Sequence, residues 1–218
     1  NPVEGGIYLG DYSTGVYKID TDGNILWGQK SFGCGSSPMW FVAADVYNGG
    51  VYANNSDCNL ILKLDSDGNE IWRKENITKP HYMYTNPIDG GIYVGAIGSV
   101  GYVSDVYRLD ADGNIQWVKY NFPGQYTYHR TVSPVDGSIT VMGIGPTSYL
   151  VAKAAMDSTV LWNVANSSGY WTYAANSLAS DIEANYFYTG DSHLNVGISK
   201  YSGADGTNEG MSTNCPSE

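Results

Sequence analysis

The sequence predicts an all-β protein built from a repeated unit, and three observations support this fold class. Only 15% of the 218 residues are charged, whereas 27 Gly, 19 Tyr and 6 Trp are present, a composition typical of strands and tight turns. The pattern Asp-x-x-Gly-x-x-x-Trp recurs at intervals of 45 residues. Short apolar runs next to each copy alternate with the two-residue period of half-buried strands.

The repeat has two landmarks that stay in step. The first is the Asp-Gly-Trp pattern, which aligns without a gap in residues 17–27, 62–72 and 107–117. An eroded fourth copy places Trp162 a further 45 residues on, and a fifth copy at 201–206 has lost its tryptophan. The second landmark is a Gly pair, or its equivalent, and the apolar residues after it; its copies lie at 5–8, 49–52, 90–93, 137–140 and 185–188. Two landmarks in step indicate true internal repeats.

Each repeat predicts four strands. In the first unit, residues 7–9 form a short apolar run, residues 15–20 alternate, and residues 25–27 begin a returning strand after an Asp-x-Asp-Gly-Asn turn. An aromatic stretch, such as residues 40–43, precedes the next Gly pair. Four strands in about 45 residues is the size of one propeller blade. We therefore expect residues 1–218 to form a single β-propeller domain of about five four-stranded blades.

The repeat, Gly-x-(Ile/Val)-Tyr followed by Tyr-x-(Ile/Leu)-Asp-x-x-Gly-x-x-x-Trp, resembles that of PQQ-like (quinoprotein-type) β-propellers. The resemblance covers nearly the whole chain, strongly through Trp117 and weakly after Ala154. It implies that Trp27, Trp72, Trp117 and Trp162 dock between neighbouring blades. The repeat is shared by dehydrogenases, scaffolds and binding propellers, so it implies architecture and no particular activity. The chain is short and has no vicinal cysteine pair, so no quinone or other cofactor is expected.

The two ends of the sequence do not match the phase of the repeat. Residues 1–6 correspond to 86–91, which places the start after the first strand of a blade, and the chain ends soon after the turn at 204–206. A closed ring would need a strand from residues 210–218 or from another chain, because an open edge favours aggregation. Three alternatives remain: a closed five-bladed ring, a processed chain or fragment of a larger propeller, and strand exchange between copies.

Composition also limits the partners and the compartment. A net charge of −11 disfavours nucleic acid and anionic lipid, and no apolar run approaches the length of a membrane span. Few lysines and many Tyr, Ser, Thr and Asn predict a secreted, extracellular protein. Export would permit a Cys34–Cys58 disulfide, with unpaired thiols as the alternative. Three glycosylation sequons, at Asn54, Asn76 and Asn166, are expected to lie in surface loops.

The Asp-x-Asp-Gly-Asn segments resemble the beginning of a calcium-binding loop. A bidentate carboxylate at the twelfth position would be needed to complete such a site. The three copies instead have Ser31, Asn76 and Asn121 there. We therefore predict hairpin turns, in which Asp and Asn side chains accept or donate local hydrogen bonds, and no metal site.

The aromatic stretch before each Gly pair is the candidate ligand site. Aligned on that pair, Trp40, His81 and Tyr128 share one column, and Phe41, Tyr82 and His129 share the next. Trp171 and Tyr173 provide the fourth copy in a shifted register. These rings are expected at one mouth of the axial channel, where they suit a sugar or a protein surface. The alternative is that they fill the centre of a small ring.

The predicted function is that of a non-catalytic, extracellular glycan- or protein-binding module. A structural subunit of an extracellular assembly, formed by self-association through terminal strands, is the alternative. The least favoured interpretation is a polysaccharide lyase in which His81, His129, Tyr128 and Arg130 form an acid–base cluster. No Ser–His–Asp spacing or nucleophile-elbow motif is visible, so no catalytic residue is assigned.

Overall fold

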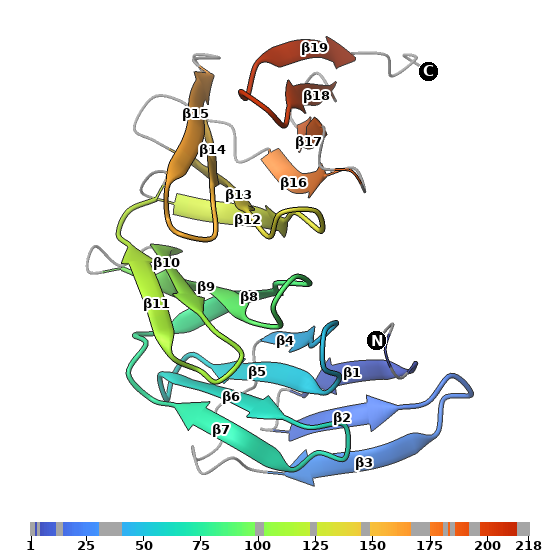
Figure 1. Cartoon of the computed structure of the whole chain (residues 1–218). Helices are drawn as coiled ribbons and strands as arrows, with labels where there is room; N and C mark the ends of the chain where they lie inside the picture. Colours follow the sequence, from blue (N-terminus) through green and yellow to red (C-terminus); the bar gives the residue numbers. More distant parts are fainter. Residues whose placement is uncertain are drawn as a thin grey trace. The chain divides into compact units, whose positions relative to one another are not determined.

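The computed structural model describes residues 3, 5–11, 15–30, 41–98, 103–122, 126–144, 149–166, 175–180, 183, 186–191 and 197–212. These residues contain β-strands and turns but no helix (Figure 1). The predicted all-β class is therefore confirmed. Five antiparallel sheets succeed one another, and within each sheet the strands are neighbours in chain order.

The first sheet has three strands and the other four have four each among the described residues. The first sheet contains β1 (Ile7–Gly10), β2 (Gly15–Ile19) and β3 (Ile25–Lys30). The second contains β4 (Phe41–Ala44), β5 (Val51–Asn55), β6 (Leu60–Leu64) and β7 (Glu70–Lys74). The third contains β8 (Pro80–Thr85), β9 (Ile92–Ile97), β10 (Val103–Leu109) and β11 (Ile115–Lys119). The fourth contains β12 (Tyr126–Val132), β13 (Ile139–Ile144), β14 (Tyr149–Ala154) and β15 (Val160–Asn166). The fifth contains β16 (Ala175–Ser180), β17 (Tyr186–Asp191), β18 (Gly197–Ser202) and β19 (Asn208–Ser212).

One detail of the predicted strand count needs correction. Among the described residues the first sheet has three strands, whereas each of the other four sheets has the expected four. At the other end of the chain, residues 208–212 form β19 and pair with β18 inside the fifth sheet. Residues 213–218 lie outside the described residues, so the predicted alternatives for closing a ring stay predictions.

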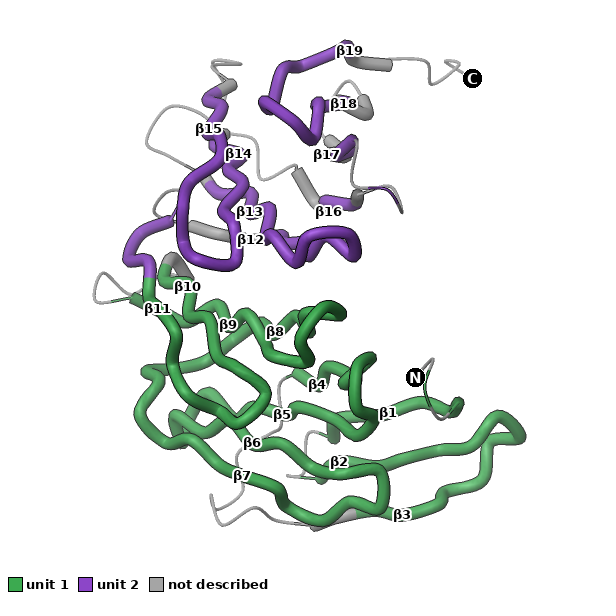
Figure 2. Tube along the Cα trace, in the orientation of Figure 1, with its two compact units in different colours: residues 1–101, 105–118 green, residues 102–104, 119–218 purple. Residues whose placement is uncertain are grey.

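The chain divides into two compact units, residues 1–101 with 105–118 and residues 102–104 with 119–218 (Figure 2). The first unit holds the first three sheets, apart from the start of β10 and the last residue of β11, and the second unit holds the last two sheets. Each unit has its own apolar core, and the prediction of one domain stays a prediction.

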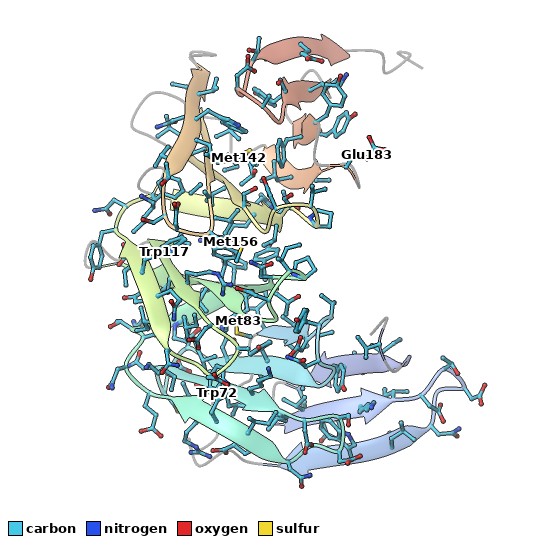
Figure 3. All side chains as sticks on the ribbon, viewed as in Figure 1. Trp72, Met83, Trp117, Met142, Met156 and Glu183 are labelled. Atoms are coloured by element: carbon cyan, nitrogen blue, oxygen red, sulfur yellow. The ribbon has the colours of Figure 1, made fainter. Side chains whose placement is uncertain are left out.

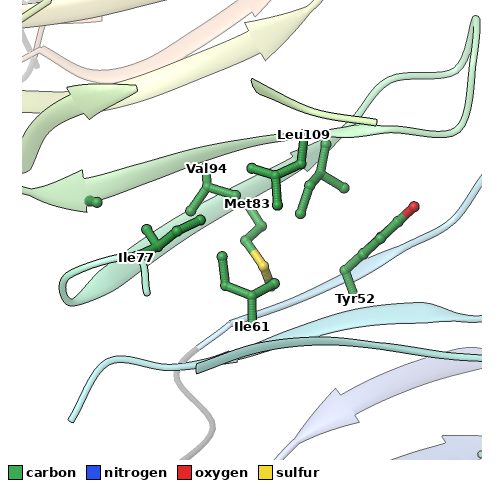
Figure 4. Packing of buried hydrophobic residues seen from close by; sticks show 8 residues of the cluster. Tyr52, Ile61, Ile77, Met83, Val94 and Leu109 are labelled. Carbon is green, nitrogen blue, oxygen red and sulfur yellow. The ribbon is translucent and has the colours of Figure 1, made fainter. Parts of the chain in front are cut away.

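The cores lie between the faces of consecutive sheets. Alternate residues of a strand point to opposite faces, so Val51 packs toward Tyr8 of the first sheet while Tyr52 packs toward Ile92 of the third. Met83 fills the same core between the second and third sheets (Figure 4). Because both faces of β5 are covered, every residue of that strand is buried.

The repeat tryptophans join each sheet to the next. The indole Nε1 of Trp27 donates a hydrogen bond of 2.8 Å to the Ser66 carbonyl, in the β6–β7 turn of the following sheet. Trp72, labelled in Figure 3, donates likewise to Ala111 at 2.8 Å, and Trp162 donates to Gly203 at 3.1 Å. The docking role that the resemblance implied is confirmed for these three residues. For Trp117 the structure shows packing on Tyr93 within its own sheet, with ring centroids 5.8 Å apart.

Each of these docking turns has a glycine beneath the indole. A Cβ atom on Gly68 would lie 2.9 Å from Cδ2 of Trp27, and one on Gly113 would lie 2.9 Å from Trp72. Gly206 has the same relation to Trp162. Glycine is therefore required at this position of the repeat for two reasons: the backbone has a positive φ, and the indole approaches too closely for a Cβ atom.

The Asp-x-Asp-Gly-Asn segments are hairpin turns, as predicted. Oδ1 of Asp20 accepts hydrogen bonds from the backbone N–H groups of Asp22 and Asn24, at 2.9 and 2.8 Å. The Asn24 side chain donates to Oδ2, and the same contacts recur around Asp65 and Asp110. The hydrogen bond from the Asn24 side chain, followed by those from the backbone, lowers the pKa of Asp20. These carboxylates are thus occupied by the turn itself.

A column of cations was missed in the sequence. A lysine stands opposite three of the repeat tryptophans on the neighbouring strand: Lys18 opposite Trp27, Lys63 opposite Trp72 and Lys153 opposite Trp162. The Lys18 ammonium donates to the same Ser66 carbonyl as the indole does, at 3.1 Å. The detectable signal was the spacing, since Lys18, Lys63, Arg108 and Lys153 are each 45 residues apart.

The fourth sheet conserves this packing with different residues. In each of the first three sheets a tyrosine of the same sheet packs on the tryptophan, as Tyr8 does on Trp27 with ring centroids 5.9 Å apart. Thr140 occupies that position in β13, and the ring against Trp162 is instead Phe187 of the fifth sheet, at 5.8 Å. Thr140 is smaller than the tyrosine it replaces, and Phe187 fills the space that this leaves. The fourth repeat therefore differs in sequence from the earlier ones but keeps an aromatic ring packed on its tryptophan.

Candidate ligand-binding face

The first strands of the sheets hold the predicted aromatic columns in a common register. Phe41, Tyr82 and His129 occupy equivalent positions, because each pairs with the fourth residue of the second strand of its sheet. Their partners are Asn54, Gly95 and Met142. The alignment of these three residues is therefore confirmed by the pairing of the strands.

The neighbouring column coincides with a β-bulge. In β8 the register shifts between Pro80 and Tyr82, so His81 is the extra residue. In β12 the shift falls between Thr127 and His129, which makes Tyr128 the extra residue. A bulge changes the direction of a side chain and is frequent beside functional sites. Alignment alone could not reveal this shift, because it depends on pairing across the sheet.

Three aromatic rings meet in the first unit, on the adjacent strands β4 and β8. The Phe41 ring centroid lies 4.7 Å from that of Tyr82 and 5.6 Å from that of His81. The His81 and Tyr82 centroids are 4.8 Å apart. All three side chains are half-buried, and Phe41 also packs against the core below. We call Phe41, His81 and Tyr82 the aromatic cluster.

The second unit contributes a different pair. His129 is half-buried in β12 and Arg130, the next residue, is buried. Burial, with a smaller effect of the Arg130 charge, lowers the pKa of His129, so its imidazole is neutral at pH 7. Such a ring offers one donor and one acceptor to a ligand rather than a charge.

Several predicted site residues lie outside the described residues. These are Trp40, Trp171 and Tyr173, and of Tyr128 only the backbone is described. The prediction that Trp171 and Tyr173 provide a fourth aromatic copy therefore stays a prediction. The first strand of the fifth sheet, β16, has its register shift between Ala175 and Ser177.

Asn54 does not lie in a surface loop. It is within β5 and fully buried, and its Oδ1 accepts a hydrogen bond of 3.0 Å from the backbone N–H of Phe41. The expected surface position of this sequon is therefore wrong, since a strand residue covered on both faces is inaccessible. Asn76 is exposed between β7 and β8, and glycosylation there stays a prediction. The side chain of Asn166 lies outside the described residues.

Cys58 is disulfide-bonded and packs against the core between the first two sheets. Cys34, its predicted partner, lies outside the described residues. Among the described residues, no group of three or more His, Cys, Asp or Glu side chains is arranged to hold a metal ion. In the same part of the chain, no helix has the length and apolar character of a membrane span.

No protein-family model and no curated protein matches the chain. A chain in the crystal structure of a mitotic checkpoint complex is similar in structure, with a TM-score of 0.71 and 12% sequence identity. The similarity covers 96% of this chain and 62% of that chain. At this identity the likeness concerns the fold alone. The successive antiparallel sheets, with tryptophans docked between them, are consistent with a propeller-like fold.

Proposed function

We propose that the chain is a non-catalytic binding module whose ligand is a protein that contacts the aromatic cluster on β4 and β8. The aromatic cluster carries this proposal. Its three rings contact one another on β4 and β8, and each is partly exposed to solvent. Aromatic side chains of this kind supply large contact area at low conformational cost, which is why they are enriched at binding surfaces.

Two further observations support a protein ligand in this position. The bulge at His81 turns a ring with hydrogen-bonding nitrogens out of the regular strand alternation. The structurally similar chain belongs to a mitotic checkpoint complex, which is an assembly of proteins. A glycan ligand would use the same rings through their apolar faces, and it is the competing outcome of the test below.

The proposal includes membership of the PQQ-like repeat family and export from the cell. The docked indoles of Trp27, Trp72 and Trp162 support the first, because the resemblance implies this role for them. The disulfide of Cys58 supports the second, because disulfides persist in oxidising compartments.

Selection from a displayed peptide library against the whole chain tests the proposal. Selected peptides should bind the chain and lose at least about tenfold in affinity to both Tyr82→Ala and His81→Ala. The matched control is Tyr47→Ala, an exposed tyrosine in the β4–β5 turn away from the aromatic cluster, which should bind normally. Melting temperatures within about 4 °C of wild type would assign the loss to contact rather than to folding.

Two outcomes would contradict the proposal. Peptides that bind Tyr82→Ala and His81→Ala as well as wild type would place the protein-binding surface elsewhere. Binding to members of a glycan array, abolished by the same substitutions and without any peptide binder, would make the ligand a glycan.

A further inference from the structure

Lys79, the residue immediately before β8, has a strained backbone. Its φ is 45°, a positive value that a long side chain rarely adopts. The next residue is Pro80, and a proline pushes the residue before it toward a negative φ in the extended region. Three other described non-glycine residues have a positive φ: Asn59 and Asn121 are asparagines, which tolerate it, and Ser158 occupies the glycine position of the repeat turn. Of these four residues, only Lys79 has no local reason for its conformation.

The surrounding structure holds Lys79 in this conformation. Its backbone N–H donates to Oδ1 of Asn59 at 2.7 Å, and its carbonyl accepts a hydrogen bond of 3.2 Å from the backbone N–H of Ile97. The hydroxyl of Ser56 donates to the carbonyl of Pro80, the next residue. Strained residues that are fixed from several sides cluster at ligand-binding sites. Lys79 is in such a place, because it precedes the bulge of β8, and with it the aromatic cluster, by two residues.

The Lys79 side chain brings a positive charge to an acidic chain, whose net charge is −11. This side chain is exposed, and in the described part of the chain no carboxylate lies within ion-pair distance of its ammonium. Three other cations of the first unit are already paired with carboxylates: Lys63 with Asp45, Arg73 with Glu70 and Arg108 with Asp89. The ammonium of Lys79 therefore has its charge to offer to a ligand.

The aromatic cluster and Lys79 offer two different contacts to one ligand. The rings of Phe41 and Tyr82 provide apolar area, and the ammonium can donate a charge-assisted hydrogen bond to an anion. The anion that fits is a single carboxylate. A polyanion would be repelled by the net charge of the chain and by the exposed Asp57, which lies in the same β5–β6 turn as Asn59.

We infer that Lys79 recognises a carboxylate of the protein ligand, next to an apolar side chain of that ligand that packs on the aromatic cluster. The inference rests on the proposed function, because it assigns a second contact to the same site. The carboxylate belongs to an Asp or Glu side chain or to a C-terminus. Its ion pair with Lys79 fixes the register of the bound segment more than it raises the affinity.

Selection of displayed peptides against the whole chain and against Lys79→Gln tests the inference. Peptides selected on the wild type should carry a carboxylate at a constant spacing from an apolar residue, whereas those selected on Lys79→Gln should not. The selection uses one library with free C-termini and one whose C-termini are extended by a constant linker. A preference that survives in the second library assigns the carboxylate to a side chain, and one confined to the first assigns it to a C-terminus.

A synthetic copy of one selected peptide gives the matched measurement. Replacing its carboxylate by a carboxamide should weaken binding to the wild type about two- to fivefold, as expected for a solvent-exposed ion pair. The same replacement should not change binding to Lys79→Gln, and it should still weaken binding to Lys79→Arg, which keeps the charge. The control is Lys74→Gln on β7, three strands away from β4 in the second sheet, which should behave as the wild type.

A glycine variant tests whether the strain is retained for binding. Lys79→Gly should raise the melting temperature by about 2–4 °C, because glycine adopts a positive φ freely, and should lose the preference for a carboxylate. A lower melting temperature than that of the wild type would overturn the argument from strain.

The outcomes distinguish this inference from the proposed function. Peptides that depend on Tyr82 and His81 but show no preference for a carboxylate would overturn the inference and leave the proposed function standing. The same preference on Lys79→Gln as on the wild type would do so too. Absence of any peptide binder would overturn both.

Discussion

Two glycine substitutions separate the contribution of indole docking from that of turn geometry. Gly23→Ala and Gly68→Ala change the same position of the repeat, where φ is 87° and 84° respectively. An added methyl group on Gly23 meets no described atom within 4 Å, whereas one on Gly68 would lie 2.9 Å from Cδ2 of Trp27. The two variants therefore share the backbone cost and differ in the contact with the indole.

The expected free energies follow from this difference. A non-glycine residue in the left-handed region costs about 1–2 kcal/mol, and both variants should lose this amount of unfolding free energy. Gly68→Ala should lose about 1–3 kcal/mol more, because a methyl group forced into a packed contact displaces its neighbours. The indole of Trp27 cannot simply withdraw, since its Nε1 is held by the Ser66 carbonyl at 2.8 Å.

Urea unfolding followed by tryptophan fluorescence measures the difference. The midpoint should fall further for Gly68→Ala than for Gly23→Ala at an unchanged dependence on urea concentration. Gly113→Ala, with the same 2.9 Å approach to Trp72, should behave like Gly68→Ala. Equal midpoints for Gly23→Ala and Gly68→Ala would show that the indole does not press on the turn, and the account of sheet docking would be wrong.

Three more predictions concern other contacts of the repeat. Lys63→Met should lower the free energy of unfolding, measured by urea denaturation, by about 3–5 kcal/mol. The reason is that the Asp45 carboxylate, which is fully buried and lies 2.9 Å from the Lys63 ammonium, would lose its counter-charge. Adding Asp45→Asn should recover part of this loss. Burial raises the pKa of Asp136, but hydrogen bonds, chiefly from Ser138, outweigh it and lower the pKa to about 2. Ionised Asp136 therefore stabilises the fold above about pH 4, and this contribution is lost as the pH falls toward 2. The melting temperature of Asp136→Asn should therefore fall less steeply with decreasing pH than that of the wild type. Identical dependence of the two melting temperatures on pH would contradict the assignment. Thr140→Tyr and Phe187→Ile should each destabilise the chain but together restore the arrangement of the earlier sheets, with a coupling energy of about 0.5–3 kcal/mol in a double-mutant cycle and none if the two sites are independent.

The repeated parts of the fold were predictable because their physical causes are local. The Asp20 turn needs only a carboxylate, an asparagine and a glycine within five residues, and it forms as expected. The docking of Trp27 and Trp72 was implied by the resemblance of the repeat to PQQ-like propellers, and the structure confirms it. The pairing of β19 with β18 within the fifth sheet was not predictable, because it depends on contacts across the sheet.

The candidate site was only partly predictable. Counting back from the Gly pair placed Phe41, Tyr82 and His129 at equivalent positions, which the strand register confirms. The prediction for Trp171 and Tyr173, which are in a shifted register relative to the Gly pair, falls outside the described residues and stays a prediction.

Residue order alone therefore determined the all-β class, the repeat, its turns and the residues that dock, because strand alternation and turn chemistry act over a few neighbouring positions. Only the tertiary structure decided that His81 is the extra residue of a bulge, that Asn54 is covered on both faces, and that Phe187 replaces a tyrosine of the preceding sheet. These outcomes depend on which residues face one another across strands and sheets. The pairings that decide them, such as Phe41 with Asn54 and Trp162 with Phe187, join residues 13 and 25 positions apart, so no local pattern encodes them.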